Sequence, residues 1–240
     1  QVHVATCHLA VTEAMSGAKR ESIVPNYIDV DAARRTQVVH LPGALTAGDI
    51  AQVLKVQSGV ASNQSALENN PQNEQHCNKR CTFLNQPPHD PIRTQAPQVL
   101  RKALRAAITA FDKGGWGQDA GERSGDGAAE AGPLKGIDVR RLSIRNVECW
   151  EYFPGGKLDD PLHFDAGSVV TIVALLSDDF DGGCFRTFEP DDTHLEHAMD
   201  VGDIICFVSH KYHNVTEVTR GSRKTMVIEL WEGGLPLFLR

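Results

Sequence analysis

The second half of the chain is a series of short strand-forming segments separated by turns. Apolar or alternating segments occupy residues 140–152, 169–176, 184–188, 204–208 and 225–231, with Gly, Asp and Pro between them. The segment at 169–176 is almost entirely apolar, which is typical of a strand covered on both faces. Strands of this length in succession predict a β-sandwich or jelly roll.

The first half contains the candidate helices. Residues 96–112 carry apolar side chains three and four positions apart, and Pro97 stands in the first turn, which predicts an amphipathic helix. A second helix is predicted over residues 46–56, because Thr46 and Asp49 have the spacing of a capping box. Residues 37–41 are typical of a short strand. We expect these helices to pack on one sheet of a mainly β domain.

Two polar segments interrupt this pattern. Residues 58–93 are rich in Asn, Gln, Pro and Ser, which predicts an extended surface loop. Residues 113–136 are rich in Gly and acidic residues, which predicts a flexible insertion with Trp116 as a candidate lid residue. We therefore expect an N-terminal extension (1–36) packed on the core, and a single domain (37–240) with a flexible insertion.

Composition is consistent with one soluble enzyme. The 240 residues are 41% hydrophobic and 23% charged, which is ordinary for a globular chain. A net charge of −7 argues against a nucleic-acid surface. No apolar run approaches the roughly 20 residues of a membrane span. We favour a cytoplasmic location over the secretory pathway, and the oligomeric state stays open.

The cysteines do not decide the compartment. Cys77 and Cys81 lie in a polar segment, where a disulfide would indicate secretion, and a zinc site with His76 is the less favoured alternative. The cysteines in apolar segments are expected to be buried thiols. These are Cys149, Cys184 and Cys206.

Three residues form a candidate metal site. His163 and Asp165 are two positions apart, so their side chains would share one face of an extended strand. His213 follows after several predicted strands, which gives the chain room to return. Two imidazoles and one carboxylate are the ligands of Fe(II) sites that leave coordination positions open. We predict that His163, Asp165 and His213 bind iron and are the catalytic centre.

Arg223 is a candidate anion-binding residue beside this site. It begins the last apolar segment, where Thr225 and Glu229 share its face. A guanidinium binds a carboxylate in a bidentate manner. His210 and Arg220 are separated by the same number of residues as His213 and Arg223, so they are the rival pair. Arg220 begins a predicted turn, so we prefer His213 with Arg223.

These residues belong to five segments that resemble the Fe(II)/2-oxoglutarate-dependent dioxygenases, and among them the prolyl 4-hydroxylase-like branch. The segments are Tyr152-Phe-Pro-Gly-Gly, His163-Phe-Asp165, Phe180-Asp-Gly-Gly183, Val201-Gly-Asp-Ile-Ile-Cys-Phe207 and His213-Asn-Val-Thr-Glu-Val-Thr-Arg-Gly-Ser-Arg223. The resemblance covers roughly the last ninety residues, and extends weakly to the segment that begins at Val38. It implies a double-stranded β-helix (jelly roll) with packed helices.

The resemblance also implies a reaction. An enzyme of this kind hydroxylates an unactivated C–H bond with Fe(II), O₂ and 2-oxoglutarate, which becomes succinate and CO₂, and L-ascorbate keeps the iron reduced. Arg223 would bind the distal carboxylate of 2-oxoglutarate with help from Tyr152. Relatives place a second tyrosine near 174–176, where this chain has Ala, Leu and Leu, so Thr171 or Thr225 is a candidate replacement. The intact Asp165 disfavours halogenation.

The sequence does not identify the substrate. A prolyl residue in a peptide and a free amino acid or small metabolite are both candidates. Arg186 and Glu229 could bind a charged part of the substrate, or could pair with other charges or reach solvent. Two other functions stay open: a cupin-like metal-dependent isomerase or hydrolase, and a non-catalytic jelly-roll binding module.

Overall fold

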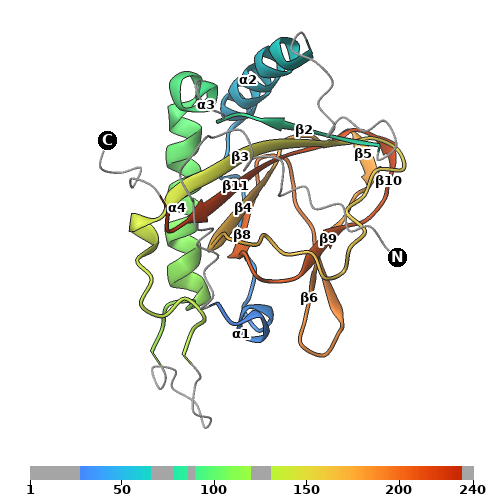
Figure 1. The fold of residues 1–240 in the computed structure, drawn as a ribbon. Coiled ribbons are helices and arrows are strands. Elements are labelled where there is room, and N and C mark those ends of the chain that lie inside the picture. The colour runs from blue at the N-terminus through green and yellow to red at the C-terminus, as the bar shows by residue number, and fades with distance from the viewer. Residues whose placement is uncertain (1–27, 66–77, 86–89, 120–130, 234–240) are drawn as a thin grey trace, which may run out of the picture.

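A six-stranded antiparallel sheet lies at the centre of the computed structural model, which describes residues 28–65, 78–85, 90–119 and 131–233 (Figure 1). Its order is β1-β8-β4-β11-β3-β2. The strands are β1 (Val39–Leu41), β2 (Lys79–Phe83), β3 (Ser143–Tyr152), β4 (Val170–Leu175), β8 (Ile204–Val208) and β11 (Arg223–Trp231). β11 pairs with β3 on one side and β4 on the other, so the last segment of the sequence lies in the middle of the sheet.

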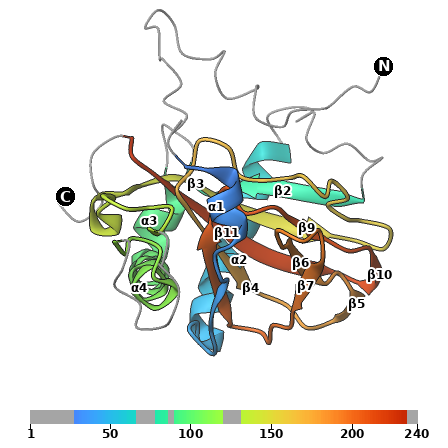
Figure 2. The same ribbon diagram turned by 90° about the horizontal axis from the view of Figure 1, so that it is seen from below.

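Two smaller antiparallel sheets lie on one side of the large sheet (Figure 2). One has the order β7-β6-β9 and the other the order β10-β5. Their strands are β5 (Phe180–Gly182), β6 (Phe185–Phe188), β7 (His194–His197), β9 (His213–Val215) and β10 (Val218–Gly221). A sheet that folds over a second sheet, with helices on the outer face, is the predicted jelly-roll architecture, and this prediction is confirmed.

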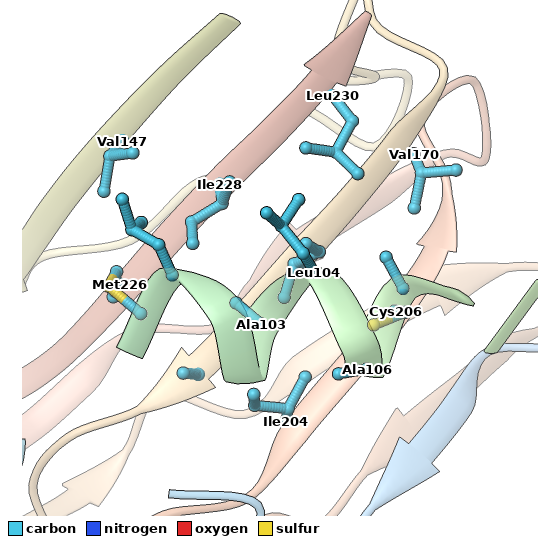
Figure 3. Packing of buried hydrophobic residues seen from close by; sticks show 14 of the residues in the cluster. Ala103, Leu104, Ala106, Val147, Val170, Ile204, Cys206, Met226, Ile228 and Leu230 are labelled. Atoms are coloured by element: carbon cyan, nitrogen blue, oxygen red, sulfur yellow. The ribbon is translucent and has the colours of Figure 1, made fainter. Parts of the chain in front are cut away.

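The helices lie mainly on the other side of the large sheet. They are α1 (Val30–Arg34), α2 (Ala47–Ser65), α3 (Pro91–Gln95) and α4 (Pro97–Gly114), with a 3₁₀ turn at Val139–Arg141. α4 matches the helix predicted over residues 96–112. Its apolar face packs against alternate residues of the sheet, as Leu104, Ile228 and Leu230 show (Figure 3). Full burial of one such side chain stabilises the fold by about 1.5–3 kcal/mol.

The two faces of β11 have different neighbours. Met226, Ile228 and Leu230 belong to the core under the helices, whereas Val227 belongs to a second apolar cluster between the sheets. Arg223 and the other odd-numbered residues of β11 alternate with the helix-facing set, so up to the bulge after Glu229 they lie on the inner face. The inner face carries all the predicted site residues of this strand.

The capping box of α2 is present. The backbone N–H and the hydroxyl of Thr46 donate to Asp49 Oδ2 at 2.8 and 2.6 Å, and the Asp49 N–H donates back to Thr46 Oγ1 at 3.3 Å. Lys102 of α4 also donates to Asp49. One carboxylate thus begins α2 and connects it to α4.

Two predictions for the polar segments were wrong. Residues 58–93 do not form one loop, because α2 continues to Ser65 and the segment also contains β2 and α3. Trp116 was a candidate lid residue in the segment 113–136, but Trp116 and Leu134 are fully buried in the helix-side core. Trp116 therefore lies in the core rather than on an exposed lid.

The structure also bears on the predictions about membrane spans and cysteines. None of the helices in the described ranges is long and apolar enough to cross a bilayer. Cys149 and Cys206 are buried, as predicted, and Cys184 is half-buried. Cys81 is buried on β2, but Cys77 and residues 1–27 lie outside the described residues. The disulfide and most of the N-terminal extension therefore stay predictions.

Candidate active site

Backbone hydrogen bonds bring the three predicted metal ligands together. His163 and Asp165 lie in the connection between β3 and β4, not on a strand as predicted, and His213 begins β9. The His213 N–H donates to the His163 carbonyl at 3.0 Å, and the Asp165 N–H donates to the carbonyl of Ser209 at 2.9 Å. These bonds join the connection to the β8–β9 turn.

The side chains converge on one point. Asp165 Oδ1 lies 3.4 Å from His163 Nε2 and 3.7 Å from His213 Nε2. One ligand atom from each of the three residues lies within 4.8 Å of the others. His213 and Asp165 are buried, whereas the His163 side chain is 29% exposed. The site is therefore open to solvent on the His163 side.

A hydrogen bond fixes the orientation of His213. Its Nδ1–H donates to the carbonyl of Lys211 at 3.0 Å, so Nε2 keeps its lone pair and points to Asp165. Burial lowers the pKa of His213, which favours the neutral imidazole that a metal requires. A backbone acceptor behind a ligating histidine is a common feature of metal sites.

Lys211 itself is anchored. Its side chain is only 1% exposed, and its Nζ donates to Glu189 at 3.0 Å and to the carbonyl of Arg34 at the end of α1. The described part of the N-terminal extension thus contacts the turn that orients His213.

Asp165 is held by a hydroxyl group. Thr171 Oγ1 of β4 donates to Asp165 Oδ2 at 2.6 Å, which leaves Oδ1 directed at the histidines. Burial by itself raises the pKa of Asp165, but His213, His163 and Thr171 more than offset this and hold the pKa well below its ordinary value. Thr171 was a candidate donor to 2-oxoglutarate, but in this structure its hydroxyl donates to Asp165. It lies opposite Glu229, at the other end of β11 from Arg223.

The donor set fits an Fe(II) ion. The arrangement presents two imidazole nitrogens and one carboxylate oxygen around a common point. The groups that orient Asp165 and His213 are already in place. Phe185 and Phe207 pack against the His213 ring, with centroids 5.5 and 4.9 Å away. These two rings cover the His213 imidazole and limit the access of water to it.

Arg223 is a buried cation without an anion. Its side chain is 3% exposed, and in the described part of the chain no carboxylate lies within ion-pair distance of its guanidinium. Its guanidinium carbon lies 5.9 Å from the centre of the Tyr152 ring, directly across the β3–β11 pair. Burial lowers the pKa of Arg223, although a guanidinium stays charged in a protein.

Tyr152 and Thr225 line the same inner face. Tyr152 is buried, and burial raises the pKa of its phenol, which therefore stays protonated and able to donate a hydrogen bond. Thr225 is buried on β11, opposite Trp150 on β3 and Leu175 on β4. Tyr152 lies directly opposite Arg223, and Thr225 is the next inward-facing residue of β11 after Arg223.

Gly183 explains the Gly-Gly motif before β6. A Cβ atom at this position would lie 2.7 Å from Cδ of Arg223 and 2.9 Å from Cγ2 of Val218. Its φ of +61° is also unfavourable for other residues. The glycine thus leaves the room that the Arg223 side chain occupies.

The rival residues lie elsewhere. His210 is buried three residues before His213, with Nδ1 3.3 Å from the carbonyl of Ile28, and it is not part of the converging triad. Arg220 is exposed and pairs with Asp179 and Asp181. Of the two pairs, His213 is the histidine that lies in the converging triad, and Arg223 is the arginine that is buried.

The two candidate substrate residues are already paired. Arg186 lies on β6 and forms an exposed ion pair with Glu196 on β7. Glu229 is buried, and it accepts from Arg145 at 3.1 Å, from Asn146 at 3.1 Å and from Ser168. Both arrangements match the alternative in which these charges pair with protein groups.

Sequence reasoning missed the residues that orient the ligands. Thr171, Ser209 and Lys211 act through hydrogen bonds to Asp165 and His213. The polar Thr171 inside an otherwise apolar strand was a usable signal, because a buried hydroxyl needs a partner. The contact between Lys211 and α1 had no local signal.

No protein-family model matches the sequence, and no curated protein matches it. Solved structures do. An oxidoreductase of the 2OG-Fe(II) oxygenase family from Burkholderia pseudomallei is 16% identical, with a TM-score of 0.55 over 82% of this chain and 85% of that chain. A prolyl-4-hydroxylase from Pseudomonas putida is 15% identical, with a TM-score of 0.50 over 85% and 97%. A non-heme alpha-ketoglutarate-dependent epimerase from nogalamycin biosynthesis is 19% identical, with a TM-score of 0.55 over 87% and 83%.

The chain therefore has the fold of 2OG-Fe(II) oxygenases, including prolyl 4-hydroxylases, which confirms the resemblance at the level of fold. Identities below 20% establish no more than this. Because a hydroxylase and an epimerase both have this fold, the reaction must be inferred from the residues of the site.

Proposed function

We propose that this protein is an Fe(II)- and 2-oxoglutarate-dependent dioxygenase that hydroxylates an unactivated C–H bond and converts 2-oxoglutarate to succinate and CO₂. The observation that carries the proposal is Arg223, a buried guanidinium with no carboxylate partner among the described residues. It lies against Tyr152, which belongs to the same apolar cluster as the two phenylalanines that pack on His213. A buried charge without a partner is costly, and a dicarboxylic acid would supply the missing anion.

His163, Asp165 and His213 would hold the iron. When bound, an Fe(II) ion with open positions supplies the redox chemistry with O₂ that no side chain can perform. The chain's own contribution is orientation. Thr171 and the Lys211 carbonyl hold two ligands in place before the metal arrives, so little rearrangement is needed on binding.

Arg223 would bind the distal carboxylate of 2-oxoglutarate in a bidentate manner. Tyr152 lies against the guanidinium and stays protonated, so its hydroxyl would donate to the same carboxylate, and Thr225 is the second candidate donor. Apolar side chains such as Val173 and Val227 surround this region, which strengthens the ionic contact by excluding water.

The substrate would approach on the exposed side of His163. A prolyl residue in a peptide is one candidate, and a free amino acid or small metabolite is the other. L-ascorbate would serve to keep the iron reduced. The likeness in fold to a prolyl-4-hydroxylase supports the first candidate without deciding between them.

Succinate formation is the direct test. The purified protein with Fe(II), 2-oxoglutarate and air should release succinate, and the Arg223→Met variant should release far less at low 2-oxoglutarate. A cupin-like isomerase or a binding module would release none with either protein, and that result would reject the proposal. Mass spectrometry of candidate peptides and amino acids for the gain of one oxygen atom would then identify the substrate.

A further inference from the structure

Glu148 is a half-buried carboxylate on the inner face of β3. It lies opposite Val227 of β11, which in turn lies opposite Val173 of β4, and both valines belong to the apolar cluster between the sheets. Side chains directly opposite each other in an antiparallel pair lie on the same face. Glu148 therefore faces the interior of the jelly roll.

The hydrogen-bond partners of Glu148 are both neutral. Asn146 Nδ2 donates to Oε1 at 2.7 Å, and the indole N–H of Trp150 donates to Oε2 at 2.7 Å. These donors fix the direction of the carboxylate but do not neutralise its charge. Asn146 also donates to Glu229, and its own Oδ1 is buried with no partner in the described structure.

The lack of a charged partner distinguishes Glu148 from the other carboxylates that are at least half-buried in the described ranges. Each of those lies within ion-pair distance of a Lys, Arg or His side chain. They are Asp49, Asp90, Glu151, Asp165, Glu189, Asp203 and Glu229. Glu148 has no such partner within those ranges.

The surrounding charges make the deficit larger. Burial and the carboxylates of Glu229 and Asp165 raise the pKa of Glu148 to about 8, whereas Trp150 and the more distant Arg145 lower it only in part. Arg145 is bound to Glu229 at 3.1 Å and to the carbonyl of Ala166 at 2.6 Å. A cation placed close to Glu148 would offset these effects and stabilise its ionised form.

Glu148 lies near the metal ligands. Thr171 on β4 donates to the metal ligand Asp165, and Thr171 lies opposite Glu229 on β11. Glu229 in turn lies opposite Asn146 on β3. Glu148 is the next residue of β3 after Asn146 that faces inward. β3 and β4 are separated by β11 alone, so they lie about 10 Å apart. A small molecule or a peptide side chain can span this distance.

We propose that Glu148 is a specificity-determining residue that binds a cationic group of the substrate, a guanidinium or an ammonium. This inference rests on the proposed function, because it places the substrate beside the His-Asp-His triad. The cation supplies the charge partner that the described residues do not provide. A guanidinium matches the two carboxylate oxygens of Glu148, which Asn146 and Trp150 already orient.

Two matched pairs of probes test this. Equilibrium dialysis with the iron- and 2-oxoglutarate-loaded protein under nitrogen compares N-acetyl-arginine amide with N-acetyl-citrulline amide, and N-acetyl-lysine amide with N-acetyl-norleucine amide. Citrulline keeps the shape of arginine without its charge, whereas norleucine lacks the terminal nitrogen of lysine. At least one cationic probe should bind roughly tenfold or more tightly than its neutral match, which is the effect of one charged hydrogen-bonded contact.

The Glu148→Gln variant should lose this preference, because it keeps the shape of the side chain but not the charge. Glu148→Asp, which keeps the charge, should retain part of it and serves if the glutamine variant does not fold. The exposed Glu217→Gln is the matched control and should keep the full preference. Equal binding of cationic and neutral probes by the unaltered protein, or an undiminished preference in Glu148→Gln, would overturn the proposal.

Substrate-independent succinate release by the same preparations separates the two inferences. If succinate forms and the cation preference is absent, the proposal for Glu148 fails while the proposed function stands. If no succinate forms in any preparation, the proposed function fails.

Discussion

Tyr152 and Arg223 lie directly opposite each other on β3 and β11, with the guanidinium carbon 5.9 Å from the centre of the phenol ring. The pair occupies the inner face of the sheet, and both side chains are buried. An aromatic face stabilises a cation but does not neutralise it. The arrangement therefore prepares a positive charge for an anionic ligand.

Arg223→Met should raise the KM for 2-oxoglutarate by about 10- to 100-fold, because it removes charged hydrogen bonds to a carboxylate. Steady-state succinate formation measures it. Arg220→Gln is the control, since Arg220 is exposed and pairs with Asp179 and Asp181, and its KM should not change. An unaltered KM in Arg223→Met would remove the main support for the proposed function.

Asp165→Ala should weaken Co(II) binding by more than about 100-fold, because one of three ligand side chains is lost. The visible absorption of bound Co(II) measures the affinity without any turnover. His210→Asn should bind Co(II) as the unaltered protein does, since His210 lies outside the triad. If His210→Asn lost the metal and Asp165→Ala kept it, the assignment of the ligands would be wrong.

Thr171→Val should lower metal affinity by about 10- to 100-fold while the fold persists, because the two side chains have nearly the same shape and only the hydroxyl's hydrogen bonds to Asp165 and Ser209 are lost. The Co(II) titration and a thermal melt should be compared. A large loss of stability with unchanged affinity would show that Thr171 serves the fold rather than the ligand.

Lys211→Met should lower the free energy of unfolding by roughly 3 kcal/mol, because it leaves Glu189 and the Arg34 carbonyl without their buried donor. Urea denaturation measures this. Since the Lys211 carbonyl orients His213, Co(II) affinity should fall as well. Lys135→Met, which removes an exposed ion pair with Asp119, should change the unfolding free energy by less than about 1 kcal/mol.

Glu148→Gln should make the protein more stable at alkaline pH. The pKa of Glu148 is about 8 in the folded protein and near its ordinary value when unfolded, so its ionisation costs stability as the pH rises between these two values. The advantage of the glutamine variant should therefore be full above pH 8 and disappear below about pH 4.5. Thermal melts across this range measure it.

Glu151→Gln is the opposite case on the same strand. Burial alone raises the pKa of Glu151, but Arg80 and Lys224 lower it below its ordinary value, so its charge stabilises the fold above that value. The variant should be less stable than the unaltered protein at neutral pH, with the difference lost on acidification. Equal pH profiles for the two variants would contradict the assignment of Glu148 as an unpaired acid.

The sequence by itself determined the features that depend on local patterns. Apolar residues three and four apart predicted α4, the offset of Thr46 and Asp49 predicted the start of α2, and alternation predicted that Arg223 and Thr225 share one face of a strand. These follow from helix and strand geometry over a few residues, so no distant contact was needed. The predicted turn at Arg220 likewise favoured His213 with Arg223 over His210 with Arg220.

Only the tertiary structure decided which groups neutralise one another. The burial of Trp116 and the hydrogen bond from Thr171 to Asp165 depend on segments that pack together from distant parts of the chain. Lys211 reaches back to α1 across 177 positions. Among the residues that the structure describes, no cation lies beside Glu148, and this too was decided by the tertiary structure, because a charge is balanced by its neighbours in space, whatever their places in the sequence.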